Sequence, residues 1–345
     1  MRSIVALSVG CPAGIGPEVA VAAAVAAPKH GPQPVLVADP EVVAAAMAVR
    51  DIPSRRLVVV DDPAEAREIR KHAVVVWSGS TRLAKLSRWG APTAADGATQ
   101  LAWVDQAADL VRDGRADALV TGPVSKAAIA SSGAPGTASF RGHTEHLAAR
   151  LGAAEVVMAF WSPALTVGLV TTHLSLAQVP NAIDAEGVAR ATYWVARLVQ
   201  DLGRDKPRIV VCALNPHAGE GGLLGTEEQT AIGPGVALAR KRLAESDVEA
   251  TVDGPIGAES ALRRSIAGKR DRPHWDAAIA MYHDQATIAS KLVGFGDAVN
   301  ISLGLPIIRT SVDHGTGYDL AGKGEADEAG MAAAIELAGK LIDSR

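Results

Sequence analysis

Three histidines stand at equivalent places in the sequence, each just after a short apolar run that is typical of a buried strand. The runs cover residues 165–172, 208–214 and 277–282, and the histidines that follow them are His173, His217 and His283. Ligands bind at the carboxyl ends of strands in open α/β sheets, and three neutral imidazoles with an open fourth position form a catalytic zinc-type site. Imidazole nitrogen also suits cobalt, nickel or manganese. On the pattern alone, three structural histidines remain the alternative.

Other polar residues could hold the anionic part of a substrate. Residues 142–146 (GHTEH) predict a helix start, where free N–H groups favour an anionic oxygen beside His143 and Thr144. Thr144 could equally be only the helix N-cap. Lys291, Asn300 and Arg309 lie near predicted strand ends. Arginine binds carboxylate or phosphate as a planar fork and lysine acts as a point charge, although each residue alone also suits an ordinary surface position.

Three glycine-rich loops could bring their backbones close to a ligand. The first, residues 10–18 (GCPAGIGPE), joins a predicted strand to a predicted helix, a place that favours anions. It is neither a G-x-G-x-x-G nor a Walker A sequence, so a structural turn is an equal interpretation. The loops 215–222 and 313–324 are long and polar enough to wrap a dinucleotide, although surface loops near helix caps have the same composition.

The elements that must position these residues alternate along the chain. Short β-branched runs, most without polar alternation, are separated by Ala-rich stretches with helical spacing, such as residues 17–27 and 185–202. This alternation predicts an α/β fold with a largely parallel sheet. Residues 244–276 are more polar and less regular, and we expect loops there. The length of 345 residues suggests two domains or one two-lobed unit.

Composition narrows the class of protein. The net charge of −4 lacks the basic excess of a sequence-general nucleic-acid binder, and no apolar stretch approaches the roughly 18 residues of a membrane span. Two cysteines indicate neither a disulfide framework nor a cysteine zinc site, which fits a reducing compartment. The apolar run 4–9 is too short for a signal peptide. We therefore expect a soluble, cytoplasmic protein that contacts neither nucleic acid nor membrane.

Eight segments together resemble the 4-hydroxythreonine-4-phosphate dehydrogenase family of pyridoxal phosphate synthesis. They follow the family's order along nearly the whole chain: PAGIGPE (12–18), TGPVSK (121–126), GHTEHLA (142–148), TTHLSL (171–176), NPHAGEGG (215–222), MYHDQ (281–285), VNISLGLPIIRTSVDHGT (299–316) and DLAGKGEAD (319–327). The resemblance implies an isocitrate/isopropylmalate dehydrogenase-like fold, with two α/β/α lobes, largely parallel sheets and a cleft between the lobes. We expect a first lobe of residues 1–125 plus 305–345 with the cofactor loop. Residues 126–304 then form a second lobe with the metal and dimer contacts.

The resemblance also implies an activity and a set of site residues. The family oxidises 4-phosphohydroxy-L-threonine with NAD (NADP is possible) and a divalent metal ion, Zn, Co, Mg, Ni or Mn, and the resulting β-keto acid loses carbon dioxide. By the family pattern, His173 and His217 ligate the metal in one subunit of a homodimer, and His283 of the partner subunit completes the set. The expected substrate contacts are His143, Thr144, Lys291, Asn300 and Arg309. The expected dinucleotide contacts are Gly219, Gly222, His314, Gly315, Thr316 and Asp319, and the candidate catalytic residues are Asp284 and Lys291.

The sequence departs from the family around the substrate and cofactor. Cys11 stands where an acidic residue is usual, Glu259 takes the place of an aspartate, Arg141 precedes the GHTE segment, and Gly317-Tyr318 replaces a small and an aliphatic residue. We interpret Cys11 as a small apolar substitute. With the three histidines and the substrate cations intact, these changes favour a retained reaction on a substrate that could differ.

Two further readings stay open beside the family's own reaction. The first is a paralogous NAD-dependent dehydrogenase of another hydroxy acid, such as a carboxylated cis-dihydrodiol or a phosphorylated sugar acid. The second is a phosphotransacetylase-like acyltransferase, since related α/β lobes serve that chemistry. It needs neither a histidine triad nor a dinucleotide loop, so the presence of His173, His217 and His283 argues against it. A purely structural role agrees poorly with so many polar residues at predicted strand ends.

Overall fold

The chain divides into two compact units in the computed structural model, which describes all residues except 1, 29, 70–71, 138–139, 268–272 and 295. Unit 1 contains residues 1–154 and 305–343, and unit 2 contains residues 155–304 with the last two residues. Residues 126–154 therefore belong to unit 1, whereas the sequence analysis places them in the second lobe. No helix in the described part of the chain combines the length and the apolar character needed to cross a membrane.

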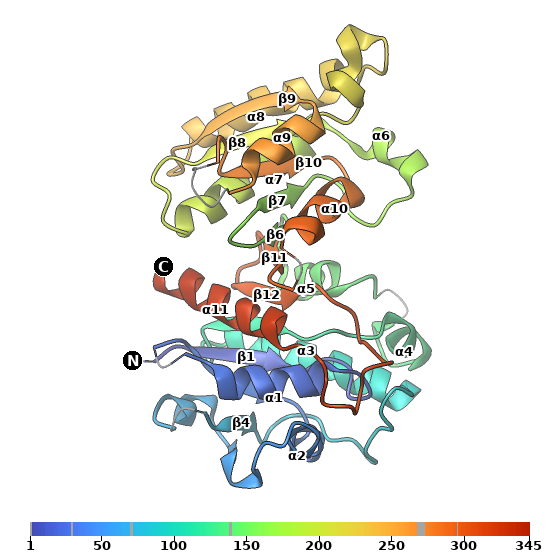
Figure 1. Cartoon of the computed structure of the whole chain (residues 1–345), viewed down its shortest axis with the longest axis vertical. Helices are drawn as coiled ribbons and strands as arrows, with labels where there is room; N and C mark the ends of the chain where they lie inside the picture. The colour runs from blue at the N-terminus through green and yellow to red at the C-terminus, as the bar shows by residue number, and fades with distance from the viewer. Residues whose placement is uncertain (1, 29, 70–71, 138–139, 268–272, 295) are drawn as a thin grey trace. The chain divides into compact units, whose positions relative to one another are not determined.

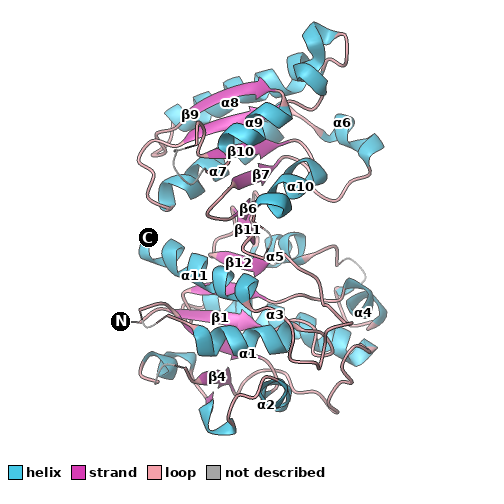
Figure 2. Cartoon of the chain, in the orientation of Figure 1, coloured by secondary structure: helices cyan, strands magenta, loops and turns pink. Residues whose placement is uncertain are grey.

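Unit 1 is built on a six-stranded sheet in the order β3-β4-β2-β1-β5-β12, with every pair parallel. The strands are β1 Ile4–Ser8, β2 Gln33–Val37, β3 Leu57–Val60, β4 Val74–Trp77, β5 Ala118–Thr121 and β12 Arg309–Val312. The helices are α1 Gly16–Ala26, α2 Pro40–Val49, η1 Ser54–Arg56, η2 Pro63–Arg67, α3 Ala94–Arg112, α4 Lys126–Ser131, α5 His143–Leu151 and α11 Ala329–Asp343. Figures 1 and 2 show the elements of this unit.

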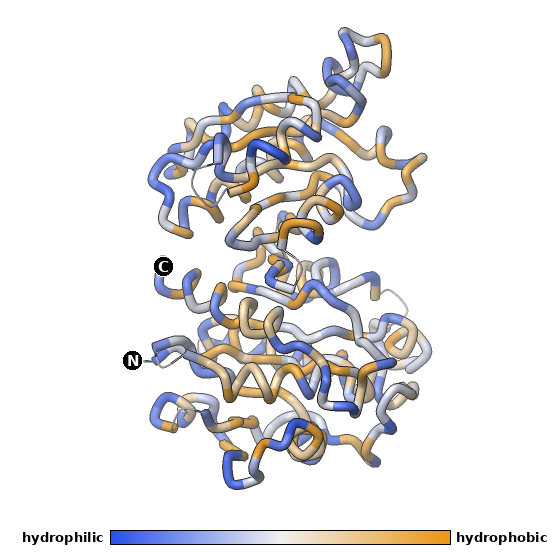
Figure 3. Tube along the Cα trace, viewed as in Figure 1, coloured by the Kyte–Doolittle hydropathy of each residue, from blue (hydrophilic) through white to orange (hydrophobic). Residues whose placement is uncertain are grey.

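The central strands of unit 1 are buried on both faces. All five residues of β1 and of β2 are buried, which explains why these runs lack polar alternation. Helix α1 is likewise apolar around most of its circumference, as its colour in Figure 3 shows, and residues 16–24 are all buried. A helix that is hydrophobic all round must be enclosed by its neighbours, so α1 is a core helix of unit 1.

The strands of unit 2 follow the order β11-β6-β7-β10-β8-β9. The pairs β7-β10, β10-β8 and β8-β9 are parallel, and β11-β6 and β6-β7 are antiparallel. The strands are β6 Val157–Trp161, β7 Thr166–Leu169, β8 Arg208–Cys212, β9 Thr251–Ile256, β10 Ala277–Ala280 and β11 Val299–Leu303. The helices are η4 Leu176–Gln178, α6 Val179–Ala182, α7 Ala185–Asp201, η5 Pro216–Gly222, η6 Glu228–Ile232, α8 Gly233–Ala244, α9 Ala258–Ser265 and α10 His283–Val293.

Alternate residues of β6 enter two different cores of unit 2. Val157 and Ala159 pack with residues of α7 and α8, whereas Met158 and Phe160 pack with residues of α9 and α10. The sheet is thus covered by helices on both faces, and the prediction of an α/β fold with largely parallel sheets is confirmed. In Figure 1 the segment around α6 and the connection from β8 to α8 extend away from the body of this unit.

Residues 244–276 are not all loops, and this expectation is wrong for two elements. Strand β9 pairs only with β8, so it is an edge strand, and its Thr251 and Asp253 are exposed. Helix α9 buries Ala261 and Leu262 while its remaining side chains are mostly exposed. Both elements carry too few apolar residues to be recognised from composition.

Candidate functional site

His173 and His283 are brought together by the ends of two neighbouring strands in unit 2. Beyond β7 and β10, the backbone N–H groups of Val170 and Thr171 donate to the carbonyls of Ala280 and Met281, at 2.9 and 3.1 Å. The register set by these bonds places the following residues side by side, and the centroids of the two imidazole rings lie 5.6 Å apart. The strand-end argument therefore gives the correct position for these two of the three histidines.

The imidazole of His283 is oriented by its neighbour Asp284. The two side chains form a hydrogen bond of 2.7 Å between Nδ1 of His283 and Oδ1 of Asp284. Because a carboxylate oxygen accepts, Nδ1 is the donor of this bond, and in the neutral tautomer with this proton Nε2 has the free lone pair. This is the arrangement that metal-binding histidines usually have, with the carboxylate fixing the tautomer.

His217 lies in an unusual backbone turn within η5. Five successive residues, 217 to 221, have positive φ angles of 51°, 55°, 78°, 44° and 69°. The base of this turn is held by Glu228, a buried residue whose Oε1 accepts from the N–H groups of Leu214 and Asn215 at 2.9 and 2.8 Å. Left-handed non-glycine residues are costly and persist only where the surroundings determine them. We therefore assign Glu228, which the sequence analysis missed, to the positioning of the His217 turn.

The His217 turn borders a cavity of about 840 Å³ in unit 2. Glu259, Tyr282 and Gln285 also line this cavity. Gln285 links β8 to β10, because its Nε2 donates to Ala213 O at 2.9 Å and its Oε1 accepts from Met281 N at 2.7 Å. The cavity thus places Glu259, which replaces a family aspartate, in the same space as the predicted ligand His217.

The three predicted ligands are nevertheless not assembled within one chain. In the part of the chain that the structure describes, no group of three or more His, Cys, Asp or Glu side chains could hold a metal ion. The structure pairs His173 with His283, whereas the expected division puts His173 with His217 in one subunit. The donor types, imidazole nitrogen with nearby carboxylates, are those that zinc, cobalt, nickel and manganese accept.

A cluster of cationic and imidazole side chains forms the second candidate site, in unit 1. Arg309 opens β12 and is almost fully buried, and its Nη2 donates to Thr121 Oγ1 at 2.6 Å. Burial lowers the pKa of Arg309 to about 9, against an opposing effect from Glu145. His143 has a pKa well below its usual value because of burial and then the charges of Arg309, His146 and Lys126. Such a concentration of positive charge favours an anion.

The start of α5 adds backbone donors to this cluster. Gly142 is the N-cap residue, and among the described residues its helix receives no side-chain capping bond. Thr144 is buried inside the first turn, so it is not the N-cap. Nε2 of His143 is buried and has no hydrogen-bond partner in the described chain. The neutral imidazole of His143 and the Arg309 guanidinium together suit a phosphate or carboxylate oxygen.

Lys126 is a site residue that the sequence analysis did not single out. It is the last residue of the TGPVSK segment and the first of α4, and its charge contributes to the lowered pKa of His143. Lys291 and Asn300, the other expected substrate residues, belong to unit 2. Lys291 is exposed in the last turn of α10, and Asn300 lies on β11 opposite Phe160.

The expected dinucleotide contacts fall on two segments. His314, Gly315, Thr316 and Asp319 follow β12 in unit 1, whereas Gly219 and Gly222 lie in the η5 turn of unit 2. Nδ1 of His314 hydrogen-bonds with Gly315 O at 2.9 Å, and its Nε2 is buried without a partner in the described chain. The segment after β12 thus presents a polar atom that a ligand could satisfy.

Two departures from the family pattern, Cys11 and Tyr318, are in contact with each other. The thiol of Cys11 and the hydroxyl of Tyr318 form a hydrogen bond of 3.5 Å. Burial raises the pKa of both groups, so both keep their protons at neutral pH. Cys11 is fully buried, which agrees with its interpretation as a small apolar substitute.

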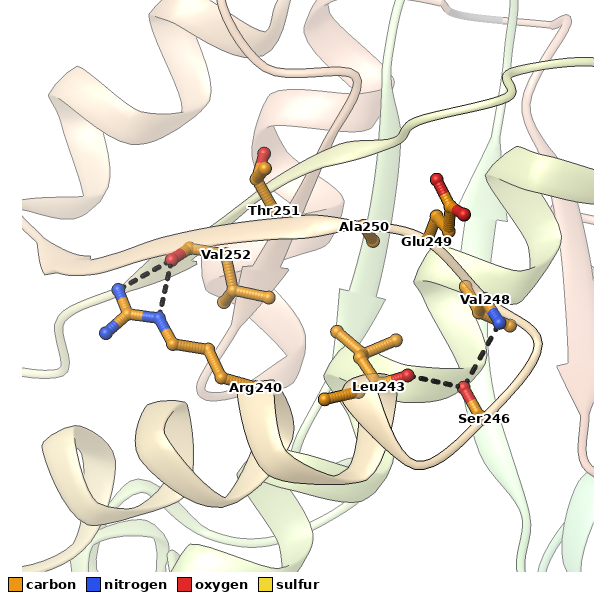
Figure 4. Close-up of a pocket in the computed structure, with 9 residues that line it drawn as sticks. Arg240, Leu243, Ser246, Val248, Glu249, Ala250, Thr251 and Val252 are labelled. Atoms are coloured by element: carbon orange, nitrogen blue, oxygen red, sulfur yellow. Dashed lines mark hydrogen bonds between the residues drawn. The ribbon is translucent and has the colours of Figure 1, made fainter.

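A second cavity in unit 2, of about 520 Å³, lies between the end of α8 and β9 (Figure 4). None of the expected site residues lines it. The guanidinium of Arg240 donates to Val252 O through both Nε and Nη2, at 3.0 and 2.7 Å. Arg240 thus satisfies a backbone carbonyl of the edge strand β9, which is a structural role.

Comparison with known proteins identifies the family. The family model described as "Pyridoxal phosphate biosynthetic protein PdxA" matches residues 30–338. The chain belongs to this family. It is 38% identical over 339 residues to the 4-hydroxythreonine-4-phosphate dehydrogenase of Desulfosudis oleivorans, covering 98% of this chain and 95% of that relative.

Two solved structures support the same relationship. The 4-hydroxythreonine-4-phosphate dehydrogenase of Klebsiella pneumoniae has a TM-score of 0.83 at 32% identity, covering 99% of this chain and 100% of that one. The terephthalate 1,2-cis-dihydrodiol dehydrogenase of Burkholderia xenovorans has a TM-score of 0.64 at 30% identity, covering 99% and 98%. Membership in the PdxA family makes the chain an enzyme of the oxidoreductase class.

Proposed function

We propose that this PdxA-family chain catalyses the metal-dependent oxidative decarboxylation of 4-phosphohydroxy-L-threonine with NAD, in pyridoxal phosphate biosynthesis. The observation that carries the choice of substrate is the buried guanidinium of Arg309, whose charge acts on His143 at the start of α5 together with that of Lys126. A buried guanidinium is costly to keep charged, and a phosphate group offsets that cost. We assign the substrate phosphate to these residues of unit 1, with Thr144, and propose Lys291 and Asn300 as further substrate contacts.

The histidines of unit 2 are the proposed metal ligands. His173 and His283 are paired, and Asp284 keeps the Nε2 lone pair of His283 available for a metal. His217 is the third ligand, with Glu259 in the same cavity as a further oxygen donor. A divalent ion bound by these residues supplies Lewis acidity, which favours loss of the substrate hydroxyl proton and of carbon dioxide.

The remaining chemistry is proton transfer and orientation by side chains. Oxidation moves a hydride from the carbinol carbon to NAD and releases the hydroxyl proton; the β-keto acid then loses carbon dioxide, and the carbon left behind takes up a proton. We assign proton transfer to Lys291, with Asp284 holding His283 in place. The segment His314–Asp319, with Gly219 and Gly222, is proposed to bind the dinucleotide.

We further propose that the enzyme is a homodimer whose second copy completes the metal site. Six of the large apolar side chains exposed on unit 2 follow the three histidines along the chain: Leu174, Leu176, Leu223, Leu224, Ile288 and Leu292. Leu223 and Leu292 are 84% and 81% exposed. Large apolar side chains that are exposed close in sequence to the candidate ligands suit a protein interface, and a second copy would also supply the ligands that the described part of one chain does not assemble. The two unbridged, buried cysteines agree with a cytoplasmic location.

Leu292→Asp is expected to convert the dimer to a monomer and to remove activity together with the bound metal. A charge on the exposed face of α10 would be buried without a partner in the dimer, which costs several kcal/mol. Light scattering after size-exclusion chromatography gives the oligomeric state, and elemental analysis gives the metal content. Leu86→Asp is the matched control, because Leu86 is an exposed leucine of unit 1. A monomeric Leu292→Asp variant with full activity contradicts the shared site.

The alternative function is oxidation of a carboxylated cis-dihydrodiol, the substrate class named for the Burkholderia xenovorans relative. Cys11, which contacts Tyr318, replaces an acidic residue of the family pattern. This replacement is the observation that supports a different substrate class. NADH formation should be compared for 4-phosphohydroxy-L-threonine and for terephthalate cis-dihydrodiol at equal concentrations. We expect turnover of the phosphorylated compound at least about 100-fold faster, since only it can satisfy a phosphate cluster. Faster oxidation of the dihydrodiol would overturn the proposed substrate.

A further inference from the structure

The first glycine-rich loop, residues 10–18, lies directly against the segment that follows β12. The N–H of Ile15 donates to Thr316 O at 2.9 Å. A Cβ atom added at Gly14 would stand only 2.7 Å from the same carbonyl oxygen, so only glycine permits this approach. Residues 10–18 therefore support the segment that follows β12. The sequence alone does not distinguish this structural role from ligand binding.

Glu18, at the end of this loop in the first turn of α1, binds two backbone groups of the same segment. Its side chain is completely buried. Oε1 accepts from Gly322 N at 2.5 Å, and Oε2 accepts from Gly324 N at 3.0 Å. Gly322 and Gly324 have φ angles of +82° and +73°, and these left-handed residues form the turn whose two N–H groups the carboxylate binds.

Arg50, the C-cap residue of α2, binds the carbonyl groups of the same turn. Its Nη1 donates to Gly324 O at 3.0 Å and to Ala326 O at 2.6 Å, while Nη2 pairs with Glu328 at 2.6 Å. The turn is therefore clamped by opposite charges, an anion on its N–H groups and a cation on its carbonyls. Both clamping side chains come from elements of unit 1 that lie far from the turn in sequence.

Oε1 and Oε2 of Glu18 each face a backbone N–H group, so the side chain at position 18 must present two hydrogen-bond acceptors. An ionised carboxylate only accepts, so it satisfies two N–H groups at once. Glutamine has the same size but carries an NH₂ group, which would point a donor at one of the two backbone donors. A buried donor that faces another donor loses its bond and keeps its desolvation penalty. Glu18→Gln is thus a nearly isosteric change that should loosen the turn selectively.

We propose that Glu18 is a positioning residue: by fixing the turn in residues 319–326, it holds the adjoining segment His314–Asp319 in the conformation that binds NAD. The inference rests on the proposed function, because it takes the segment after β12 as the dinucleotide-binding segment. Glu18 does not touch the cofactor in this proposal and acts through the backbone of Gly322 and Gly324. It fixes the shape of the segment before NAD arrives, which lowers the entropic cost of binding.

Glu18→Gln is expected to accelerate amide hydrogen exchange in residues 319–326 about 10-fold or more, because a charge-assisted bond that resists local opening is lost. The KM for NAD should rise by a similar factor, while kcat at saturating NAD stays within about 2-fold of wild type. KM for the phosphorylated substrate and the metal content should not change. Exchange is read by mass spectrometry on the full-length protein, and the kinetic constants by NADH absorbance.

The matched control is Glu65→Gln, which alters an exposed carboxylate that accepts a single backbone N–H, that of Asp62, at 2.8 Å. Unchanged exchange in residues 319–326 of Glu18→Gln overturns the clamp, whatever the enzyme's substrate. Faster exchange with an unchanged KM for NAD overturns the link to the dinucleotide. If Glu18→Gln does not fold, Arg50→Gln loosens the same turn from its carbonyl side and should show the same pattern. If the wild-type enzyme turns over no NAD, the proposed function fails and the exchange measurement alone decides the clamp.

Discussion

Replacing His217 with alanine is expected to lower kcat about 1,000-fold or more, because a lost metal contributes several kcal/mol of transition-state stabilisation at 1.36 kcal/mol per tenfold. The variant should also lose the bound divalent metal. The fold should survive, since the His217 side chain is exposed and the turn is held by Glu228 and not by the imidazole. Alanine already occupies the left-handed conformation at the next position, Ala218, so the substitution is compatible with the turn.

Elemental analysis of the purified protein, NADH formation and the circular dichroism melting curve together check this prediction. His30→Ala, which changes an exposed histidine in a turn of unit 1, should leave all three unchanged. Full activity of His217→Ala with no bound metal would contradict the assignment of His217 as a ligand. A variant that keeps its metal but loses turnover would place His217 in another role.

Arg309→Met is expected to raise KM for the phosphorylated substrate about 100-fold, because truncating one partner of a buried, hydrogen-bonded charge pair costs 2–5 kcal/mol. Arg309→Lys should also lose most of the affinity, since lysine is a point charge and cannot form the planar fork. The guanidinium binds the anion only in its charged form. Because burial lowers the pKa of Arg309 to about 9, affinity for phosphate in the wild-type protein should fall as pH rises through that value.

Two measurements check the role of Arg309. Steady-state kinetics gives the change in KM, and the melting temperature with and without inorganic phosphate gives binding independently of turnover. Wild type should gain thermal stability in phosphate, and Arg309→Met should not. The control is Arg112→Met, which removes a half-exposed arginine paired with Asp109 at the end of α3. An Arg309→Met variant that is still stabilised by phosphate would place the anion elsewhere.

Local sequence patterns predicted most of the fold because the central strands are buried on both faces. Runs such as residues 4–9 and 208–214 contain β-branched residues without alternation, and they became β1 and β8. The edge strand β9 escaped recognition because its outer side is solvated and its sequence includes Asp253 and Pro255. By composition alone, such a strand cannot be distinguished from a polar loop.

The boundary of unit 1 could not be predicted because it depends on contacts between side chains far apart in sequence. Helix α5 is attached to α3 by His146–Asp105 at 2.6 Å and by Arg150–Asp109 at 2.6 Å. These pairs attach α5 to unit 1, to which residues 126–154 belong. No periodicity in the sequence distinguishes such a helix from one that packs in unit 2.

The positions of the candidate site residues were predicted only in part, because the sequence shows local patterns but not contacts between distant residues. The positions of His173 and His283 were predicted from the strand ends, and the two residues lie close together because neighbouring parallel strands end at the same edge of a sheet; their role as ligands stays a prediction. Glu18 and Glu228 were missed because a buried glutamate on a helix has the same local sequence as a surface glutamate. Glu18 is defined by backbone N–H groups more than 300 residues away along the chain. Such partners become visible only in three dimensions.

The most direct test of the proposed reaction is NADH formation from 4-phosphohydroxy-L-threonine, measured before chelation, after chelation and after addition of divalent metals. We expect robust turnover that chelation abolishes and that zinc, cobalt, nickel, manganese or magnesium restores. That result would establish the substrate, the dinucleotide and the metal dependence together. Turnover that persists after complete removal of metal would contradict the metal site built on His173, His217 and His283. No turnover by the metal-loaded enzyme would instead contradict the substrate and turn attention to carboxylated dihydrodiols.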